Sequence, residues 1–119
     1  MSPILPWTLF ALGVGHVLYG CVKFRAPLKA AVASGFVGKF STPEVRRTAF
    51  WFVMFGPMLM LAGQVVIHAA AIGDTHLVRL VGAYGFGVSV VGVCAFPKSP
   101  FLASLAISAM LLALGFGYL

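Results

Sequence analysis

Long apolar stretches alternate with short polar segments along this chain. Four stretches contain no Lys, Arg, Asp or Glu: residues 4–22, 49–73, 80–97 and 99–119. A helix needs about 20 apolar residues to cross roughly 30 Å of hydrocarbon, because each residue adds about 1.5 Å. The pattern therefore predicts four transmembrane helices. Their expected spans are about residues 4–22, 49–73, 77–97 and 100–119.

The composition agrees with a lipid environment. Of the 119 residues, 61% are hydrophobic and only 8% are charged, and the mean hydropathy is +1.07. A soluble domain of this length is far less apolar. No flexible linker interrupts residues 1–119, so we expect one all-α domain, an integral membrane four-helix bundle that runs up-down-up-down.

The basic residues predict the orientation of this bundle. The connector from Lys23 to Thr48 holds six Lys and Arg residues against Glu44, and Lys98 lies in the third connector. Of the eight Lys and Arg residues, only Arg79 lies on the opposite side, with Asp74. Connectors rich in Lys and Arg stay in the cytoplasm. We therefore expect both termini on the non-cytoplasmic side, and the net charge of +6 to face membrane lipids rather than nucleic acid.

Several motifs mark the expected helix ends. Residues 41–44 (Ser-Thr-Pro-Glu) resemble a capping box that starts the second span near Pro43. Gly73 followed by Asp74 is typical of a helix stop and a new cap, so the second and third spans are expected to be antiparallel neighbours. Ser99 and Pro100 are expected as the cap and the first residue of the fourth helix.

The first connector is too long to lack structure in a protein of this size. Apolar residues recur every four positions in it, which predicts an amphipathic helix on the inner membrane surface. These residues are Leu28, Val32, Phe36 and Phe40. Cys21 and Cys94 fall near the cytoplasmic ends of their spans, where we expect free thiols that serve as small apolar packing residues.

Polar side chains at membrane depth are costly and mark candidate sites. His16 is the deepest ionisable residue, about 9 Å from the cytoplasmic boundary, and Tyr19 follows one turn later. Glu44 and Arg47 begin the second span and could join them as an acid–base cluster. The alternative is a histidine bonded to a backbone carbonyl and an ordinary exposed ion pair.

The remaining candidates are expected to contact a ligand. Trp51 lies at the depth of His16, and Pro57 frees a backbone carbonyl in mid-span, which favours a kink or a pocket. A second polar group lies toward the outside, where capping by Asp74 and snorkelling by Arg79 also explain most of it. Its candidate ligand-binding residues are Gln64, His68 and Tyr84.

Neither a metal nor a cofactor is expected. The chain contains no phosphate-binding loop, no Cys-x-x-Cys, no HExxH and no nucleophile elbow. Two histidines on different spans could ligate haem, but His16 lies in the inner half of the membrane and His68 in the outer half. This difference in depth argues against haem.

Three sequence segments resemble a family of small bacterial and fungal four-helix membrane proteins known only as a domain of unknown function. They are GVGHVLYG at residues 13–20, RRTAFWFVMFGPMLMLAG at 46–63 and FPKSPFL at 96–102. The resemblance implies the four-helix membrane fold and draws attention to His16, Arg47 and Trp51. It implies no activity.

Three functions stay open at this stage. The first is binding of an apolar small molecule, in its stronger form as an acid–base enzyme of the isomerase, epoxide-opening or cyclising kind. The second is an accessory or scaffold subunit that docks on membrane protein partners through glycine-rich faces. The third is a small transporter that works as a homo-oligomer, against which stands the lack of a glutamate within any span.

Overall fold

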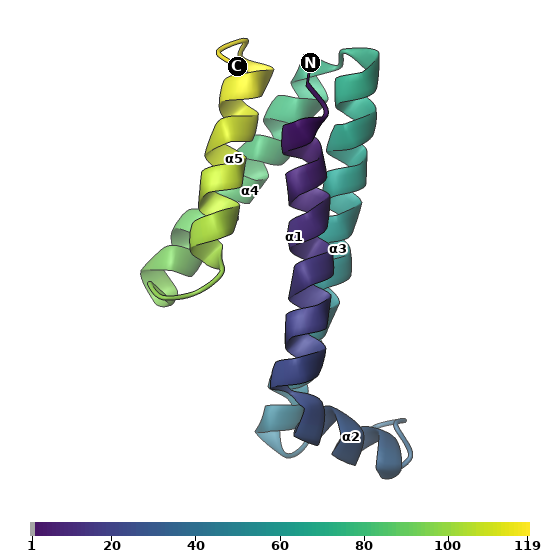
Figure 1. Ribbon diagram of the computed structural model, residues 1–119. Coiled ribbons are helices and arrows are strands. Elements are labelled where there is room, and N and C mark those ends of the chain that lie inside the picture. Colours follow the sequence, from purple (N-terminus) through teal and green to yellow (C-terminus); the bar gives the residue numbers. More distant parts are fainter. Residues whose placement is uncertain (1) are drawn as a thin grey trace.

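The computed structural model describes residues 2–119, and this part of the chain is all-α with five helices (Figure 1). The predicted fold class is confirmed at this level. Three of the helices, α1, α3 and α4, are long and apolar enough to cross a membrane, whereas α5 is apolar but has only 15 residues. The helices are α1 (Ile4–Lys23), α2 (Arg25–Ala33), α3 (Glu44–Ile72), α4 (Thr75–Ala95) and α5 (Phe101–Gly115).

The turn between α3 and α4 has the predicted form. Gly73 ends α3 in the left-handed region at φ 74°, which a residue without a Cβ adopts at little cost. The side chain of Asp74 then caps α4 by accepting a hydrogen bond from the backbone N–H of Leu77 at 3.0 Å. This cap satisfies one of the free N–H groups at the helix start.

Two other predicted helix starts differ in detail. α3 begins at Glu44, close to the predicted Pro43, but the predicted capping box does not form. Pro43 is the cap residue, and no side chain caps this end. α5 begins at Phe101 rather than at Pro100. The Ser99 hydroxyl still accepts a hydrogen bond from the backbone N–H of Phe101, at 3.3 Å.

The connector helix α2 is shorter than predicted. It turns away from α1 at Phe24 and ends at Ala33 (Figure 1). Gly35, Phe36 and Gly38 all have positive φ angles, which a right-handed helix cannot accommodate. The four-residue spacing therefore describes a helix only over its first half, and Phe36 and Phe40 lie in the following loop, with their ring centroids 5.1 Å apart.

The long helices form two pairs rather than an even bundle. α1 packs along α3 and α4 packs along α5, whereas α3 and α4 contact each other much less than either contacts its pair partner. The expected antiparallel packing of α3 on α4 is therefore limited. Figure 1 shows the two pairs meeting near the chain termini and diverging toward the other end. We call these the termini end and the basic end.

Small residues explain the close contact within each pair. A Cβ added at Gly13 of α1 would lie 2.6 Å from the backbone nitrogen of Met60 in α3, and one at Gly85 of α4 would lie 2.5 Å from the Ser108 hydroxyl in α5. Side chains at these positions would force the backbones apart. Such small-residue seams are typical of helix packing in membranes, where hydrophobic burial drives association only weakly.

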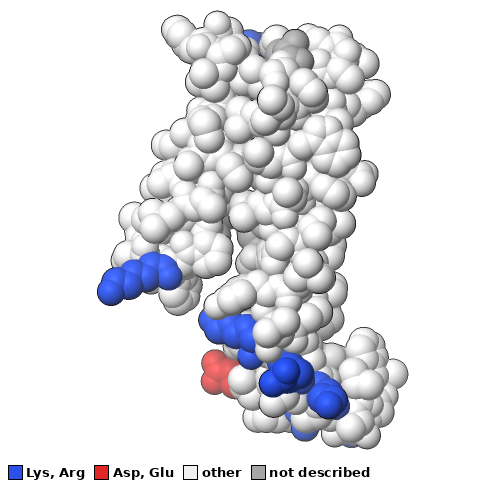
Figure 2. All heavy atoms as spheres, in the orientation of Figure 1, with Lys and Arg blue, Asp and Glu red and all other residues white. Residues whose placement is uncertain are grey.

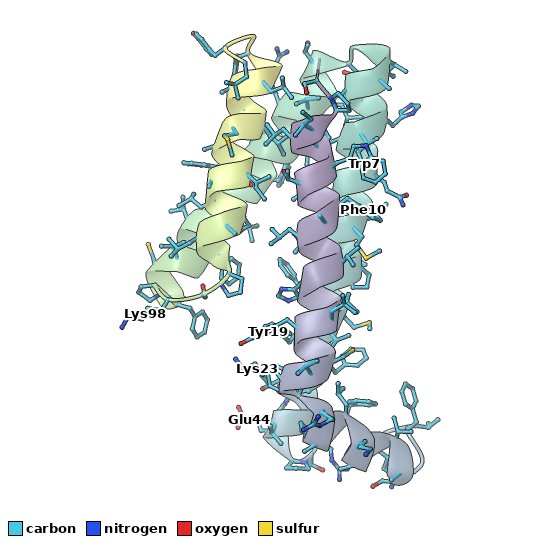
Figure 3. All side chains as sticks on the ribbon, in the orientation of Figure 1. Trp7, Phe10, Tyr19, Lys23, Glu44 and Lys98 are labelled. Atoms are coloured by element: carbon cyan, nitrogen blue, oxygen red, sulfur yellow. The ribbon has the colours of Figure 1, made fainter. Side chains whose placement is uncertain are left out.

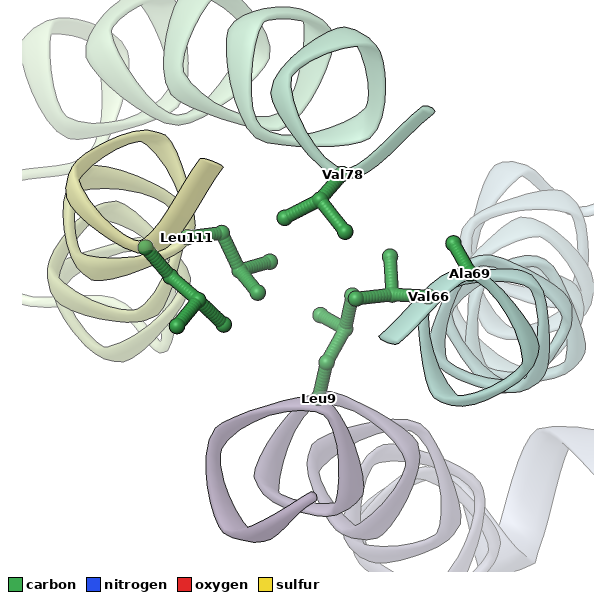
Figure 4. Close-up of a cluster of buried hydrophobic side chains, with 6 residues drawn as sticks. Leu9, Val66, Ala69, Val78 and Leu111 are labelled. Atoms are coloured by element: carbon green, nitrogen blue, oxygen red, sulfur yellow. The ribbon is translucent and has the colours of Figure 1, made fainter. Parts of the chain in front are cut away.

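One apolar cluster joins the two pairs at the termini end (Figure 4). Leu9 of α1, Val66 of α3, Val78 of α4 and Leu111 of α5 point toward a common centre and are almost fully buried. Ala69 and Leu114 complete the cluster. Toward the basic end, Phe55 of α3 and Phe101 of α5 still approach each other, with ring centroids 6.2 Å apart, but among residues 2–119 the buried apolar cluster is confined to the termini end.

Most large apolar side chains lie on the outer surface. Leu18 is 63% exposed, Leu61 is 58% exposed and Val91 is 69% exposed, while the buried residues are mainly small. A soluble protein rarely leaves so much apolar surface uncovered. The pattern is that of helices that face lipid. Cys21 and Cys94 are free thiols as expected, but both are exposed, so they do not serve as packing residues.

Candidate functional site

A cavity of about 870 Å³ lies between the two helix pairs where they diverge. Figure 2 shows the hollow between two lobes of the molecule, with Lys and Arg gathered at the basic end. Its volume falls in the range of about 300–1,000 Å³ that is typical of small-molecule sites. We call it the main cavity. Its aromatic lining residues are Tyr19, Phe24, Trp51, Phe52, Phe55, Phe96 and Phe101.

His16 lies on the wall of the main cavity. Gly13 and Gly20, one turn away on either side, are buried against α3 and bring the two helices close together. This approach lets the imidazole stack on Phe52, with ring centroids 4.1 Å apart and planes 18° apart, while Phe55 contacts it edge-on. Two rings from α3 therefore hold the imidazole in place.

The Nε2 atom of His16 has no hydrogen-bond partner among the described residues, although it is buried. A buried polar atom left unsatisfied costs about 1–3 kcal/mol. Such atoms are rare in folded proteins and often mark a functional position.

Two further predicted site residues share this cavity. Tyr19 lies one turn from His16, and its ring centroid is 5.9 Å from that of Phe52. Trp51 lines the cavity from α3, the other helix of this pair, and is 65% exposed. The structure thus brings His16, Tyr19 and Trp51 together on one wall, which the α1–α3 pair forms.

The other predicted residues lie elsewhere. Glu44 and Arg47 are exposed in the first turn of α3 and do not line the main cavity, so the acid–base cluster is not assembled there. Pro57, Gln64 and His68 line neither cavity, and both Gln64 and His68 face outward. Helix α3 continues through Pro57 without interruption.

Tyr84 lines a second, smaller cavity of about 330 Å³. This cavity lies nearer the termini end and shares Phe55, Leu59 and Ser104 with the main cavity. At the boundary of the two, the hydroxyls of Ser89 and Ser104 form a buried hydrogen bond of 2.7 Å between α4 and α5. The bond ties this helix pair together and leaves the shared wall apolar.

Sequence reasoning missed several residues of the main cavity. Lys23 and Lys98 line it from opposite helix pairs, but their charges were used only to predict orientation. Nothing in the sequence distinguishes Phe52 and Phe101 from the other apolar residues of their spans. Only the fold shows that they line the same cavity from different helix pairs. One signal in the sequence indicates the two lysines. Lys23 and Lys98 each lie at the end of an expected span, on the same side of the membrane.

The site offers no metal-binding set. Among residues 2–119, no group of three or more His, Cys, Asp or Glu side chains is placed to hold a metal ion. The arrangement instead suits an apolar molecule with a polar group, because aromatic rings dominate the wall and one histidine interrupts it.

Comparison with protein-family models matches residues 1–115 to a family described as "Family of unknown function (DUF6463)". No curated protein and no solved structure matches the chain. The resemblance drawn from the sequence is confirmed to the extent that it named a family of unknown function. The chain belongs to the DUF6463 family, since the match covers nearly its whole length.

Proposed function

We propose that this DUF6463 protein is a four-span integral membrane protein that binds an apolar small molecule in its main cavity. Both termini would lie on the non-cytoplasmic side and the basic end in the cytoplasm, which agrees with the positive-inside rule. α5 would form the fourth span together with its flanking residues, because the 15 helical residues alone cover only about 22 Å.

The observation that carries the proposal is the unpartnered Nε2 of His16 beside a cavity of about 870 Å³. A void of this size between helices would also be costly unless lipid or a ligand filled it. One ligand that fills the cavity and bonds His16 removes both costs.

The stronger form of the proposal is acid–base catalysis. His16 would remove a proton from one carbon of the ligand and return it to another, as in an isomerase, with Tyr19 as the nearest hydroxyl on the same wall. Glu44 and Arg47 drop out of the catalytic set because they lie outside the cavity. Epoxide opening and cyclisation would use the same two residues.

The two other candidates have less support. Gly13, Gly56 and Gly82, which would belong to the docking faces of a scaffold subunit, contact a neighbouring helix of the chain itself, whereas Gly15 and Gly87 are open. A proton-coupled exporter needs a carboxylate at membrane depth, and Glu44 is exposed at the basic end.

Native mass spectrometry tests the binding proposal with a matched pair of variants. Leu12 lines the main cavity and Leu18, on the same helix, is 63% exposed and does not. Leu12→Trp fills the cavity, so the small-molecule adduct seen on gently purified protein should disappear. Leu18→Trp should retain it. An adduct that survives Leu12→Trp, or a bare wild-type protein, would contradict the proposal.

A further inference from the structure

Two lysines lie at the mouth of the main cavity, one on each helix pair. Lys23 is the last residue of α1, and Lys98 lies in the connector between α4 and α5 (Figure 3). Both side chains are exposed and both line the cavity. Among residues 2–119 no Asp or Glu lines the cavity, and Glu44 lies at the basic end (Figure 3).

The ammonium group of Lys23 lies close to the aromatic wall. Its Nζ atom is 5.5 Å from the ring centroid of Phe24, 5.7 Å from that of Tyr19 and 5.9 Å from that of Phe52. These distances are within the range of cation–π attraction, about 6 Å. The positive charge is therefore held against the rim of the cavity rather than extended away from it.

The wall changes character with depth. Along α1 the cavity extends from Lys23 to Leu12, which is about 16 Å at 1.5 Å per residue. Beyond the lysines the lining is mainly aromatic and aliphatic. Its polar side chains are Tyr19, His16, Thr48, Ser99 and Ser104, and His16 lies seven residues or about 10 Å from Lys23. The cavity is thus cationic at its mouth and mainly apolar inside.

We propose that the ligand is an anionic single-chain amphiphile, whose carboxylate or phosphate is bound by Lys23 and Lys98 and whose chain lies along Phe52, Phe55 and Phe101. This inference rests on the proposed function and specifies its ligand class. An uncharged apolar molecule would make no use of the two ammonium groups at the mouth. An anionic head group supplies their counter-charge, and charge-assisted hydrogen bonds to the two lysines join the helix pairs across the mouth.

Tryptophan fluorescence allows a direct test. The chain has only two tryptophans: Trp51 lines the cavity, while Trp7 lies near the termini end and lines neither cavity (Figure 3). In a Trp7→Phe background, 9,10-dibromostearic acid quenches Trp51 only when its chain lies close to the indole. Its methyl ester is the uncharged matched probe. In a Trp51→Phe variant the remaining tryptophan is Trp7, which is also exposed. Its quenching measures the nonspecific partition of each probe.

Charge variants separate the site from the surface. Lys23→Gln combined with Lys98→Gln should raise the dissociation constant of the acid about fivefold to tenfold and leave that of the ester unchanged. Lys29→Gln combined with Lys39→Gln removes the same charge from exposed residues that do not line the cavity. This control should leave the affinity for the acid unchanged. A brominated lysophosphatidic acid is titrated in parallel. The compound with the lower dissociation constant shows whether the site prefers a phosphate or a carboxylate head group.

The outcomes are distinct. Saturable quenching by an acid, weakened only by the cavity variant, supports the inference. Equal binding of acid and ester, or equal weakening by both lysine pairs, would overturn it and leave binding of an apolar molecule in place. Quenching of Trp51 that never exceeds that of Trp7 would overturn this inference, whereas the proposed function would fall only if wild-type protein also carried no adduct in mass spectrometry.

Discussion

The imidazole of His16 stacks on the ring of Phe52, with the centroids 4.1 Å apart. This contact joins α1 to α3 at the wall of the main cavity and leaves Nε2 buried without a partner. Stacking on Phe52 and an edge contact with Phe55 hold the ring in place. Phenylalanine would stack equally well and would carry no unsatisfied nitrogen.

The first prediction follows from this contact. His16→Phe should keep the stack on Phe52, remove the unsatisfied atom and stabilise the protein by about 1–3 kcal/mol. His16→Ala should destabilise it, because the lost ring leaves an unfilled space. Unfolding temperatures in one detergent give the comparison. A clear fall for His16→Phe would mean that the nitrogen has a structural partner in the membrane.

The second prediction concerns the seam between α1 and α3. A Cβ at Gly13 would lie 2.6 Å from the backbone nitrogen of Met60 and 2.8 Å from the carbonyl oxygen of Gly56. Gly13→Ala should therefore cost about 1–3 kcal/mol of stability. Gly15 has nothing within 4 Å of its added Cβ, so Gly15→Ala should stabilise the helix by about 0.8–1 kcal/mol. Denaturant unfolding that ranks both variants alike would contradict the observed pairing.

The third prediction is the orientation. Cys21 and Cys94 are exposed free thiols, so both are first replaced by Ala. Cysteines are then placed at Ser2 and Lys39, near the two opposite ends. A membrane-impermeant maleimide applied to intact cells should label position 2 and spare position 39, because the proposed orientation places the basic end in the cytoplasm. Labelling of position 39 alone would reverse the orientation.

The fourth prediction tests catalysis in the isomerase form. The compound released from purified protein is returned to fresh protein in D2O and examined by mass spectrometry. A histidine that removes and returns a carbon-bound proton exchanges it with solvent, so deuterium should enter the compound. His16→Gln should abolish this exchange and Tyr19→Phe should slow it. Incorporation equal to that with His16→Gln would leave a binding protein without catalysis.

Local signals in the sequence predicted more of the fold than its assembly. The turn at Gly73 and Asp74 was predictable because a left-handed stop and a side-chain cap depend on adjacent residues. The pairing of helices was not, because it depends on which small residues meet across the chain. Gly13 and Ser108 can both be recognised as small, but only the fold shows that they meet Met60 and Gly85.

The candidate site shows the same limit. Tyr19 lies one helical turn from His16 and shares its wall, so spacing along one helix was enough to group them. Glu44 and Arg47 were grouped with them by expected depth, yet α3 begins at Glu44 beyond the cavity mouth. The position of Lys98 at a span end could be predicted, but the cavity that it lines depends on how the two helix pairs diverge.

The central claim is that the main cavity holds a specific small molecule in the native membrane. The most direct measurement places the photo-cross-linking residue p-benzoylphenylalanine at Trp51 and, as control, at Trp7, and irradiates intact cells before purification. Covalent capture avoids loss of the ligand in detergent. The account predicts one discrete added mass at Trp51, which lines the cavity, and a mixture of bilayer lipids at Trp7, which is exposed and lines neither cavity. The same lipid mixture at both positions would contradict it.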